Sequence, residues 1–376
     1  MHKPWNPHDE VKLKEMVNSH SNAELAAIFG RTIGSIEKKL SKIKVSRSFK
    51  TENNKLEPLY KRAYTEKELL FKFNFDFSYV ENNCPDGFVA YYFTKSNGEK
   101  VVKIMEEFNG ELILPKKKYQ SSVAKNGQPY LWVKLIDNLE RLKIIPIGDA
   151  HFGHDQFNCE SFKELVEYIK DNDDVYCFFG GDMVELASKH SIGSGMYEQD
   201  KPTNQINYFI EMVAPISHKV LWYIGGNHDS ERSMREIGID AAQFIADKLQ
   251  IPYFNEPVHV DIYWKNNIFT VFDQHGSSGS VTIGGKINKA MDPLKWQEFT
   301  HFVIMHHVHD KINKAVERVI RNRENFSLDM KKQYVVVCGS FLSYFGTYGA
   351  RKGYAPTSNG LTSLKIYKNG DYHTGD

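Results

Sequence analysis

Two features are scarce in this sequence, cysteine pairs and long apolar runs, and each absence excludes a class of protein. The four cysteines are scattered without a CxxC pair, which argues against a disulfide framework and against a zinc–thiolate site. No apolar stretch approaches the roughly 20 residues that a membrane-spanning helix needs. Residues 1–5 lack the apolar stretch of a signal peptide, so we expect a cytoplasmic protein.

An excess of one charge is also missing, because 48 Lys and Arg face 47 Asp and Glu and leave a net charge of +1. The basic residues are nevertheless concentrated near the front of the chain. Residues 31–55 contain eight Lys or Arg and two Glu, hence a local charge of +6. A basic segment of this kind favours contact with the phosphates of nucleic acid.

Apolar residues at helical spacing predict three short helices within residues 1–47. They cover residues 9–18, 23–29 and 33–43. Gly30 is a stop signal for the second helix, and Thr32 is a cap for the third. Three short helices with a turn at this point fit a helix-turn-helix module.

Residues 48–70 are polar and charged, which is typical of a linker. From Phe71 to Ile136 the apolar period changes to two, and Asn-Gly turns separate aromatic and β-branched runs. We therefore expect a small antiparallel β-domain over residues 71–140. Its role is open, since a substrate clamp and a dimer contact are both compatible with the pattern.

After Leu139, apolar strands alternate with helical stretches, which predicts an α/β domain over residues 141–376. Six strands are expected, at Leu142–Ile147, Val175–Phe179, Val220–Ile224, Ile268–Phe272, Phe302–Met305 and Tyr334–Val337.

Each of the first five strands is followed by side chains that can bind a metal. The strands end in Gly148-Asp149-Ala150-His151, Gly180-Gly181-Asp182, Gly225-Gly226-Asn227-His228-Asp229, Gln274-His275-Gly276 and His306-His307-Val308-His309-Asp310. One such cluster alone could be a turn or a hydrogen-bonded structural histidine. In an open α/β sheet, however, the carboxyl ends of the strands meet along one crevice. Burying several carboxylates and imidazoles there is too costly unless a divalent metal neutralises them.

Seven of these residues are candidate metal ligands: Asp149, His151, Asp182, Asn227, His275, His307 and His309. Oxygen and nitrogen ligands without thiolate favour manganese, with iron, zinc or magnesium as alternatives. Seven ligands exceed the needs of one ion. They suit two ions that share a bridging carboxylate, roughly 3.5–4 Å apart.

The order D-x-H, GD, GNHD, a separate His and H-x-H over residues 148–310 is similar to the signature of the calcineurin-like metallophosphoesterases. The resemblance implies a four-layer α/β/β/α fold. It also implies that Asp149, His151 and His309 hold one metal, that Asn227, His275 and His307 hold the second, and that Asp182 bridges them. The sequence departs from the family pattern at His306, where the family usually has glycine.

By the same resemblance, His228 is the histidine that binds no metal and donates to the phosphate or to the leaving oxygen. Glu185 or Asp229 would orient this histidine, while Arg232 and His190 are candidate phosphate contacts. The implied reaction is hydrolysis of a phosphate ester by a water that two metals activate, without a covalent enzyme intermediate.

The insertion at 188–205, with "GNHDSER" and "HGSSGS", looks like the phosphoesterases of bacteriophages and prophages, and implies a bacterial cell or a phage-infected host. The front helices resemble Myb-like helix-turn-helix modules. Together these features predict a nuclease or phosphodiesterase that acts on DNA. The expected DNA contacts are Arg31, Ser35, Lys38, Lys39 and Lys42.

Two other hypotheses stay open. The chain could be a phosphatase or phosphodiesterase for nucleotides or phosphoproteins, with the front module as a docking domain. It could also be a DNA-binding regulator that uses a degenerate phosphoesterase domain as a scaffold, although all seven ligand positions are filled.

Overall fold

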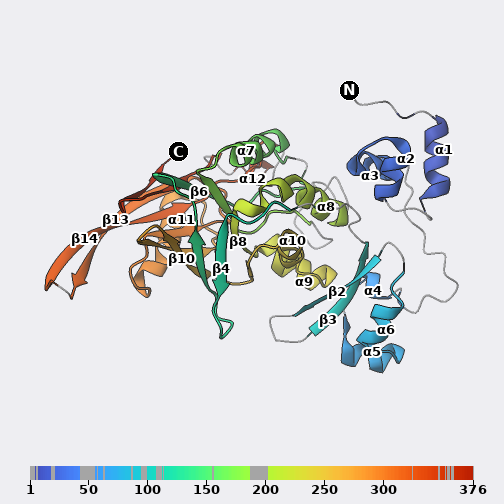
Figure 1. The fold of residues 1–376 in the computed structure, drawn as a ribbon, viewed down its shortest axis with the longest axis horizontal. Helices are drawn as coiled ribbons and strands as arrows, with labels where there is room; N and C mark the ends of the chain where they lie inside the picture. Colours follow the sequence, from blue (N-terminus) through green and yellow to red (C-terminus); the bar gives the residue numbers. More distant parts are fainter. Residues whose placement is uncertain are drawn as a thin grey trace. The chain divides into compact units, whose positions relative to one another are not determined.

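The structure is a computed structural model of the 376-residue chain (Figure 1). It describes residues 5, 7–17, 22–42, 56, 58–61, 64–85, 88–94, 100–106, 112, 114–154, 156–186, 202–323, 325–345, 348–351, 353, 356 and 360–375. The chain forms two compact units. The first is Met1–Ile113 with Ile237–Ile239, and the second is Leu114–Glu236 with Asp240–Asp376.

The first unit begins with three helices that lie over the three predicted helical segments. They are α1 (Pro7–Met16), α2 (Asn22–Phe29) and α3 (Ile33–Lys42). α2 ends where Gly30 adopts a φ of +59°, a left-handed conformation that glycine tolerates. The helices enclose their own small core, formed by Leu13, Val17, Leu25, Ala26, Ile36 and Leu40.

The rest of the first unit is mixed α and β. Its elements are α4 (Pro58–Lys61), β1 (Tyr64–Thr65), α5 (Glu66–Phe73), α6 (Phe77–Asn82), β2 (Phe88–Thr94) and β3 (Lys100–Glu106). The three strands form an antiparallel sheet in the order β1-β3-β2.

The predicted β-domain over residues 71–140 is wrong at its start, because local capping places residues 71–73 in α5 and residues 77–82 in α6. Thr65 and Glu68 form a reciprocal capping box that starts α5. Asn74 then ends α5 with a φ of +58°, and the Asp76 side chain caps α6. The alternating aromatic residues imitate a strand period, whereas the backbone follows these helix start and stop signals.

The prediction that residues 119–135 belong to a small β-domain is also wrong. β4 (Tyr119–Val123) and β5 (Tyr130–Leu135) are part of the second unit. β5 pairs in parallel with β10 (Val258–Trp264), more than a hundred residues away. Strand period reveals which face of a strand is buried but not which distant strand it joins.

The second unit contains two sheets. The seven-stranded sheet has the order β13 (Ile312–Asn322), β14 (Ser327–Val337), β12 (Phe302–Met305), β11 (Asn267–Gln274), β10, β5, β4. The six-stranded sheet has the order β16 (Tyr372–Gly375), β15 (Ser363–Tyr367), β6 (Arg141–Ile147), β7 (Val175–Phe179), β8 (Val220–Ile224), β9 (Tyr253–Phe254). The six strands predicted after Leu139 are confirmed.

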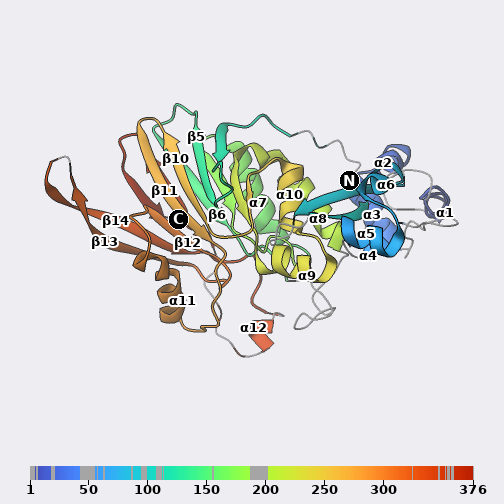
Figure 2. The ribbon, with the colours of Figure 1, turned by 90° about the horizontal axis from the view of Figure 1, so that it is seen from below.

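The sheets pack face to face and helices cover their outer faces, which gives the four-layer α/β/β/α fold (Figure 2). The helical elements of this unit are α7 (Cys159–Asp171), α8 (Pro202–Val213), η1 (Ala214–Lys219), η2 (Asn227–Arg232), α9 (Ser233–Ile237), α10 (Ala241–Leu249), α11 (Ile283–Ala290), η3 (Asp292–Lys295) and α12 (Tyr348–Arg351). α7 and α8 meet the six-stranded sheet through Phe162, Phe179 and Phe209. α11 packs on the seven-stranded sheet.

The core between the sheets is aromatic at its centre. Phe178 of β7 and Trp222 of β8 are fully buried and stack with ring centroids 4.1 Å apart. β6, β7 and β8 run parallel, as do β11 and β12. The rigid sandwich therefore brings five strand ends to one edge, where the candidate ligands follow.

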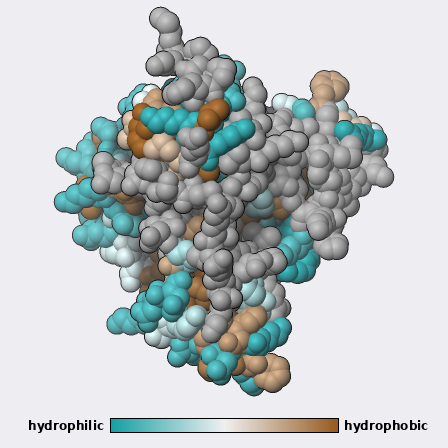
Figure 3. Space-filling model, turned by 90° about the vertical axis from the view of Figure 1, so that its right-hand side faces the viewer, coloured by the Kyte–Doolittle hydropathy of each residue, from teal (hydrophilic) through white to brown (hydrophobic). Residues whose placement is uncertain are grey.

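The surface combines hydrophilic residues with scattered apolar ones, as Figure 3 shows for the described part of one face. Single exposed apolar side chains such as Phe71 and Phe326 are ordinary on folded proteins. Within the described ranges, no helix is both long and apolar enough to cross a membrane.

The buried side chain of Lys219, at the end of η1, binds the C-terminal end of α7, and its removal tests how much this contact stabilises the helical layer. Its Nζ donates to the carbonyl oxygens of Ile169 and Asn172, at 2.6 and 2.8 Å, where α7 ends. We expect Lys219→Met to lower the free energy of unfolding by about 2–4 kcal/mol, because it leaves these carbonyls unpaired. Urea unfolding measures this loss. The exposed Lys163→Met on α7 is the control, and an equal effect of both changes would contradict the prediction.

Candidate metal centre

The backbone that carries the candidate ligands is unusual. Ten non-glycine residues in the described part of the chain have a positive φ, and five of them are candidate ligands. These five are Asp149, His151, Asp182, His307 and His309. Such conformations cost about 1–3 kcal/mol each and persist where surrounding structure enforces them. The strand ends therefore turn sharply to aim these side chains at one place.

Asp149, His151 and His309 form the first half-site. The two Nε2 atoms of the histidines are 3.0 Å apart, and His309 Nε2 is 3.4 Å from Asp149 Oδ1. This oxygen is buried and has no hydrogen-bond partner among the described residues, whereas Oδ2 accepts from the His307 backbone N–H. A buried carboxylate oxygen without a donor, facing two imidazole nitrogens, fits a cation ligand.

Asp182, Asn227, His275 and His307 form the second half-site. Asn227 Oδ1 lies 3.0 Å from His275 Nε2 and 2.8 Å from His307 Nδ1. Asp182 Oδ2 lies 3.3 Å from His275 Nε2 and 3.9 Å from His151 Nε2. Asp182 thus reaches both half-sites, as a bridging ligand must. The geometry brings all seven predicted ligands together, and this donor set fits two divalent ions.

Hydrogen bonds fix the orientation of two of the imidazoles. His275 Nδ1 lies 2.8 Å from the Gly180 carbonyl oxygen, and His151 Nδ1 lies 2.7 Å from Glu185 Oε2. A ring nitrogen that donates to such an acceptor leaves Nε2 unprotonated and free to bind metal.

The charges of the site favour added positive charge. Burial alone would raise the pKa of Asp149 and lower the pKa of His275. Attraction between opposite charges prevails: His309 lowers the pKa of Asp149 to about 2, and Asp182 raises the pKa of His275 to about 9. Asp149 likewise raises the pKa of His309 against the effect of burial. Burial and neighbouring histidines instead lower the pKa values of His151 and His307. The two carboxylates thus attract positive charge to His275 and His309, as they would attract divalent cations.

His228 lies beside the two half-sites, on the π-helical turn η2. Its Nδ1 lies 2.9 Å from the Glu185 carbonyl oxygen, and its backbone N–H donates to Asp182 Oδ1. Its ring meets the ring of His151 edge-on at 4.6 Å. Arg232, one turn later, has a guanidinium nitrogen 3.0 Å from the same Nδ1. Both residues lie next to the metal centre.

Glu185 has a different geometry from the one expected. Its carboxylate faces the Nδ1 atoms of two histidines, at 2.7 Å from His151 and 3.5 Å from His228. The closer contact is to the metal ligand, and His228 is held by the backbone carbonyl instead. Glu185 thus joins both histidines. Sequence reasoning missed its link to His151, because residues 34 positions apart show no local pattern.

Asp229 does not orient His228, contrary to the second expectation. Its buried carboxylate accepts from the backbone N–H groups of Met183 and Gly226 and from the Tyr223 hydroxyl, at 2.7–2.8 Å. With both oxygens occupied, Asp229 ties the loop after β7 to the loop after β8. Its effect on the site is to hold these loops together.

The predicted DNA contacts are placed unevenly. Arg31 lies over the Trp5 ring at 4.1 Å, and its side chain is only 6% exposed. Lys39 is buried against the same ring and pairs with Glu10. These two cations are therefore used within the module, because an aromatic ring and a carboxylate compensate their burial. Lys38 is exposed and Ser35 is half-buried. The Lys42 side chain and His190 lie outside the described residues.

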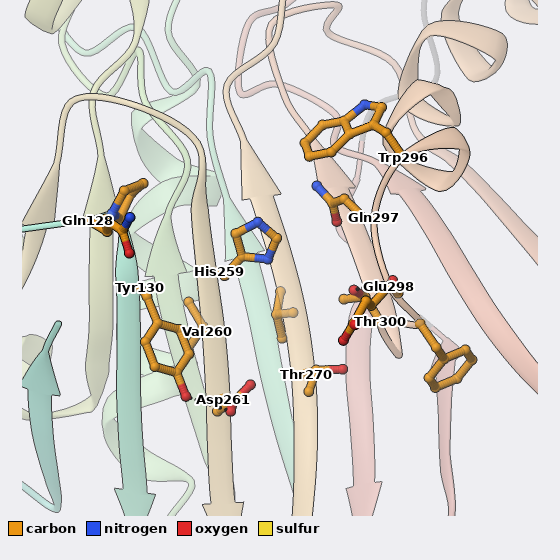
Figure 4. Close-up of a pocket in the computed structure, with 13 residues that line it drawn as sticks. Gln128, Tyr130, His259, Val260, Asp261, Thr270, Trp296, Gln297, Glu298 and Thr300 are labelled. Carbon is orange, nitrogen blue, oxygen red and sulfur yellow. Dashed lines mark hydrogen bonds between the residues drawn. The ribbon is translucent and has the colours of Figure 1, made fainter. Parts of the chain in front are cut away.

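A concavity of about 600 Å³ lies on the outer face of the seven-stranded sheet (Figure 4). Its described lining includes Trp296, His259, Asp261 and Glu298 but neither lysine nor arginine. Two carboxylates that face neither lysine nor arginine in the described lining disfavour a phosphate. The concavity contains none of the predicted site residues, so the metal centre is the better place for a phosphate ester.

The fold and the converging ligands define a metal-dependent phosphoesterase. Residues 142–356, more than half of the chain, match the family described as calcineurin-like phosphoesterase. The chain therefore belongs to the calcineurin-like phosphoesterase family, whose hydrolases hold two divalent metals. The identity of the ions and the likeness to phage enzymes stay predictions.

Similar solved structures include Vacuolar Protein Sorting 29 from Cryptosporidium parvum, with 13% identity, a TM-score of 0.31 and coverage of 63% of this chain and 97% of that chain. Vps29 of Chaetomium thermophilum has 12% identity, a TM-score of 0.27 and coverage of 62% and 95%. The calcineurin-like phosphoesterase YfkN from Bacillus subtilis has 12% identity, a TM-score of 0.30 and coverage of 63% and 89%. No curated protein matches the chain.

The Glu185 carboxylate yields a prediction for metal affinity. Glu185→Gln removes the charge that holds His151, so we expect Mn²⁺ to bind about 10–100-fold more weakly, as for other residues that orient a ligand. Calorimetric titration of the metal-free protein measures the change. Glu231→Gln, at an exposed position of the same charge, should bind like the wild type. Equal affinity of both variants would contradict the role of Glu185.

Proposed function

We propose that this chain hydrolyses phosphodiester bonds of DNA. The observation that carries the hydrolytic part is the convergence of seven ligands with His228 beside them. All positions are filled and the orienting hydrogen bonds are formed, which argues against a degenerate scaffold. When bound, two divalent ions supply an activated water and neutralise the charge of the phosphate.

The residues of this chain supply the remaining chemistry. His228 Nδ1 lies 2.9 Å from the Glu185 carbonyl oxygen, which accepts, and 3.0 Å from a guanidinium nitrogen of Arg232, which donates, so both groups hold the ring. Nε2 faces Asp182 Oδ2 at 4.0 Å, on the side of the metal centre. His228 is thus poised to donate to a phosphate oxygen or to the leaving oxygen.

Arg232 supports the binding of an anionic substrate. Its guanidinium group lies beside His228 at the edge of the metal centre. A planar fork of donors can bind two phosphate oxygens at once. We therefore assign Arg232 to the phosphate of the substrate and His228 to the transferred proton.

The choice of DNA is supported by the front of the chain. Residues 31–55 carry a charge of +6, and Lys38 presents an exposed ammonium group on α3. Phosphate contacts of this kind bind DNA without reading its sequence.

The inward placement of Arg31 and Lys39 favours a second candidate function. Two of the five expected DNA contacts are occupied within the module, which lowers its free positive charge. A phosphatase or phosphodiesterase for nucleotides or phosphoproteins, with the module as a docking domain, requires no such charge.

A cleavage assay with His228→Ala tests the enzymatic proposal. The purified chain with Mn²⁺ should cleave labelled single- or double-stranded DNA and bis-p-nitrophenyl phosphate, and the variant should be about 10²–10⁴-fold slower. His373→Ala, in β16, is the control for loss of a histidine. Hydrolysis of the small diester with intact DNA would reject the DNA substrate and favour nucleotides or phosphoproteins. Full activity of His228→Ala would reject the assigned role.

DNA binding by the full chain tests the front module. Lys38→Ala should weaken binding and reduce the slope of log K against log salt by about one, because one phosphate contact is lost. Lys125→Ala, at an exposed turn of the second unit, is the matched control. If Lys38→Ala and Lys125→Ala give the same slope as the wild type, Lys38 does not contact the DNA backbone.

A further inference from the structure

His306, which stands where the family usually has glycine, is fully buried between the aromatic core and the metal centre. Its ring meets the ring of Phe178 edge-on at 6.3 Å. The next residue is the ligand His307. The extra side chain therefore fills space at the base of the ligand-bearing loops without taking a ligand position.

The ring occupies the space that two glycines leave open. A Cβ on Gly148 would lie 2.2 Å from His306 Nδ1, and a Cβ on Gly180 would lie 1.9 Å from His306 Nε2. Neither glycine has a positive φ, so the ring, and not the backbone conformation, excludes a side chain there. Gly148 precedes the ligand Asp149, and Gly180 lies two residues before Asp182.

The ring is also tied to the strand that carries His275. His306 Nε2 lies 3.1 Å from Asp273 Oδ1, and Trp222 Nε1–H donates to Asp273 Oδ2 at 2.8 Å. Asp273 is two residues before His275. All three side chains are buried, so solvent does not weaken the contacts.

Backbone contacts complete the connection. The His306 N–H donates to the His275 carbonyl oxygen at 3.1 Å, and His275 Nδ1 is held by the Gly180 carbonyl oxygen. His306 thus contacts the loops after β6, β7 and β11 through its ring or its backbone, and it lies on the loop after β12 itself. These loops supply Asp149 and His309 to one half-site, and Asp182, His275 and His307 to the other.

We propose that His306 is a positioning residue that sets the separation of the two metal half-sites. His306 stands at the position of the family glycine. Its ring lies against Gly148 and Gly180 and keeps them apart, and its contact with Asp273 fixes the loop that carries His307. The proposal rests on the two-metal site and not on the choice of DNA as substrate. A protein that binds two ions but leaves DNA intact would still satisfy it.

The first test compares His306→Gly with His306→Gln, using Mn²⁺ alone as the probe. His306→Gly should bind at least one of two Mn²⁺ ions about 10-fold or more weakly in calorimetry, as for other residues that orient ligands. Its electron paramagnetic resonance spectrum should lose the wild-type coupling between the ions. His306→Gln can still donate to Asp273 and should recover part of both properties. Two ions bound with wild-type affinity and coupling in His306→Gly would overturn the proposal.

The second test adds side-chain volume at Gly180 with and without the His306 ring. Its result comes from comparing the two backgrounds and not from His306→Gly alone. Gly180→Ala should displace the ring and weaken Mn²⁺ binding in the wild-type background. In the His306→Gly background the added methyl group has room, so Gly180→Ala should cost less there. Circular dichroism checks that each metal-free variant is folded. Equal effects of Gly180→Ala in both backgrounds would overturn the proposed role of the His306 ring.

Discussion

The structure depends on burying two carboxylates, Asp149 and Asp182, among imidazoles at one edge of a sandwich. Asp149 is fully buried and Asp182 is 1% exposed. Isolated charges in such a place are prohibitive, so each carboxylate must be surrounded by cations or donors. Five ligand residues adopt left-handed backbone conformations to achieve this. At about 1–3 kcal/mol each, this strain rivals the net stability of a typical domain.

The scaffold has to offset that strain, and its construction explains how. The loops are short continuations of strands whose hydrophobic faces are locked between two sheets. The stacked pair Phe178 and Trp222 lies in this core, and Trp222 also donates to Asp273. The core is therefore connected to the metal centre by hydrogen bonds as well as by packing. Side chains that do not bind metal, such as Trp222 and Asp273, thus keep the ligand loops in their strained backbone conformations.

The sequence was informative wherever the signal was local. Apolar runs ending in Asp, Asn or His predicted the strands of the α/β domain and the residues that converge, because parallel strand ends meet at one edge. Prediction from the sequence failed where a strand pairs with a distant strand, and where an alternating apolar pattern does not form a strand. β5 joins β10 across the chain, and the aromatic alternation of residues 71–80 conceals helix caps at Thr65 and Asp76. The contact of Glu185 with His151 was missed for the same reason, since only the folded loops bring these two residues together.

The net charge of a segment, counted from its sequence, also differs from the charge that its surface presents to a binding partner. The composition of residues 31–55 suggests a strongly basic surface, but the cationic groups of Arg31 and Lys39 both pack on the aromatic ring of Trp5. Asp9 and Glu10 then oppose the same two cations. What such a module presents to a polyanion depends on the cations left outside these contacts, such as Lys38. A nucleic-acid substrate would then owe more of its orientation to the metal centre and Arg232, where the phosphate must in any case be held for reaction.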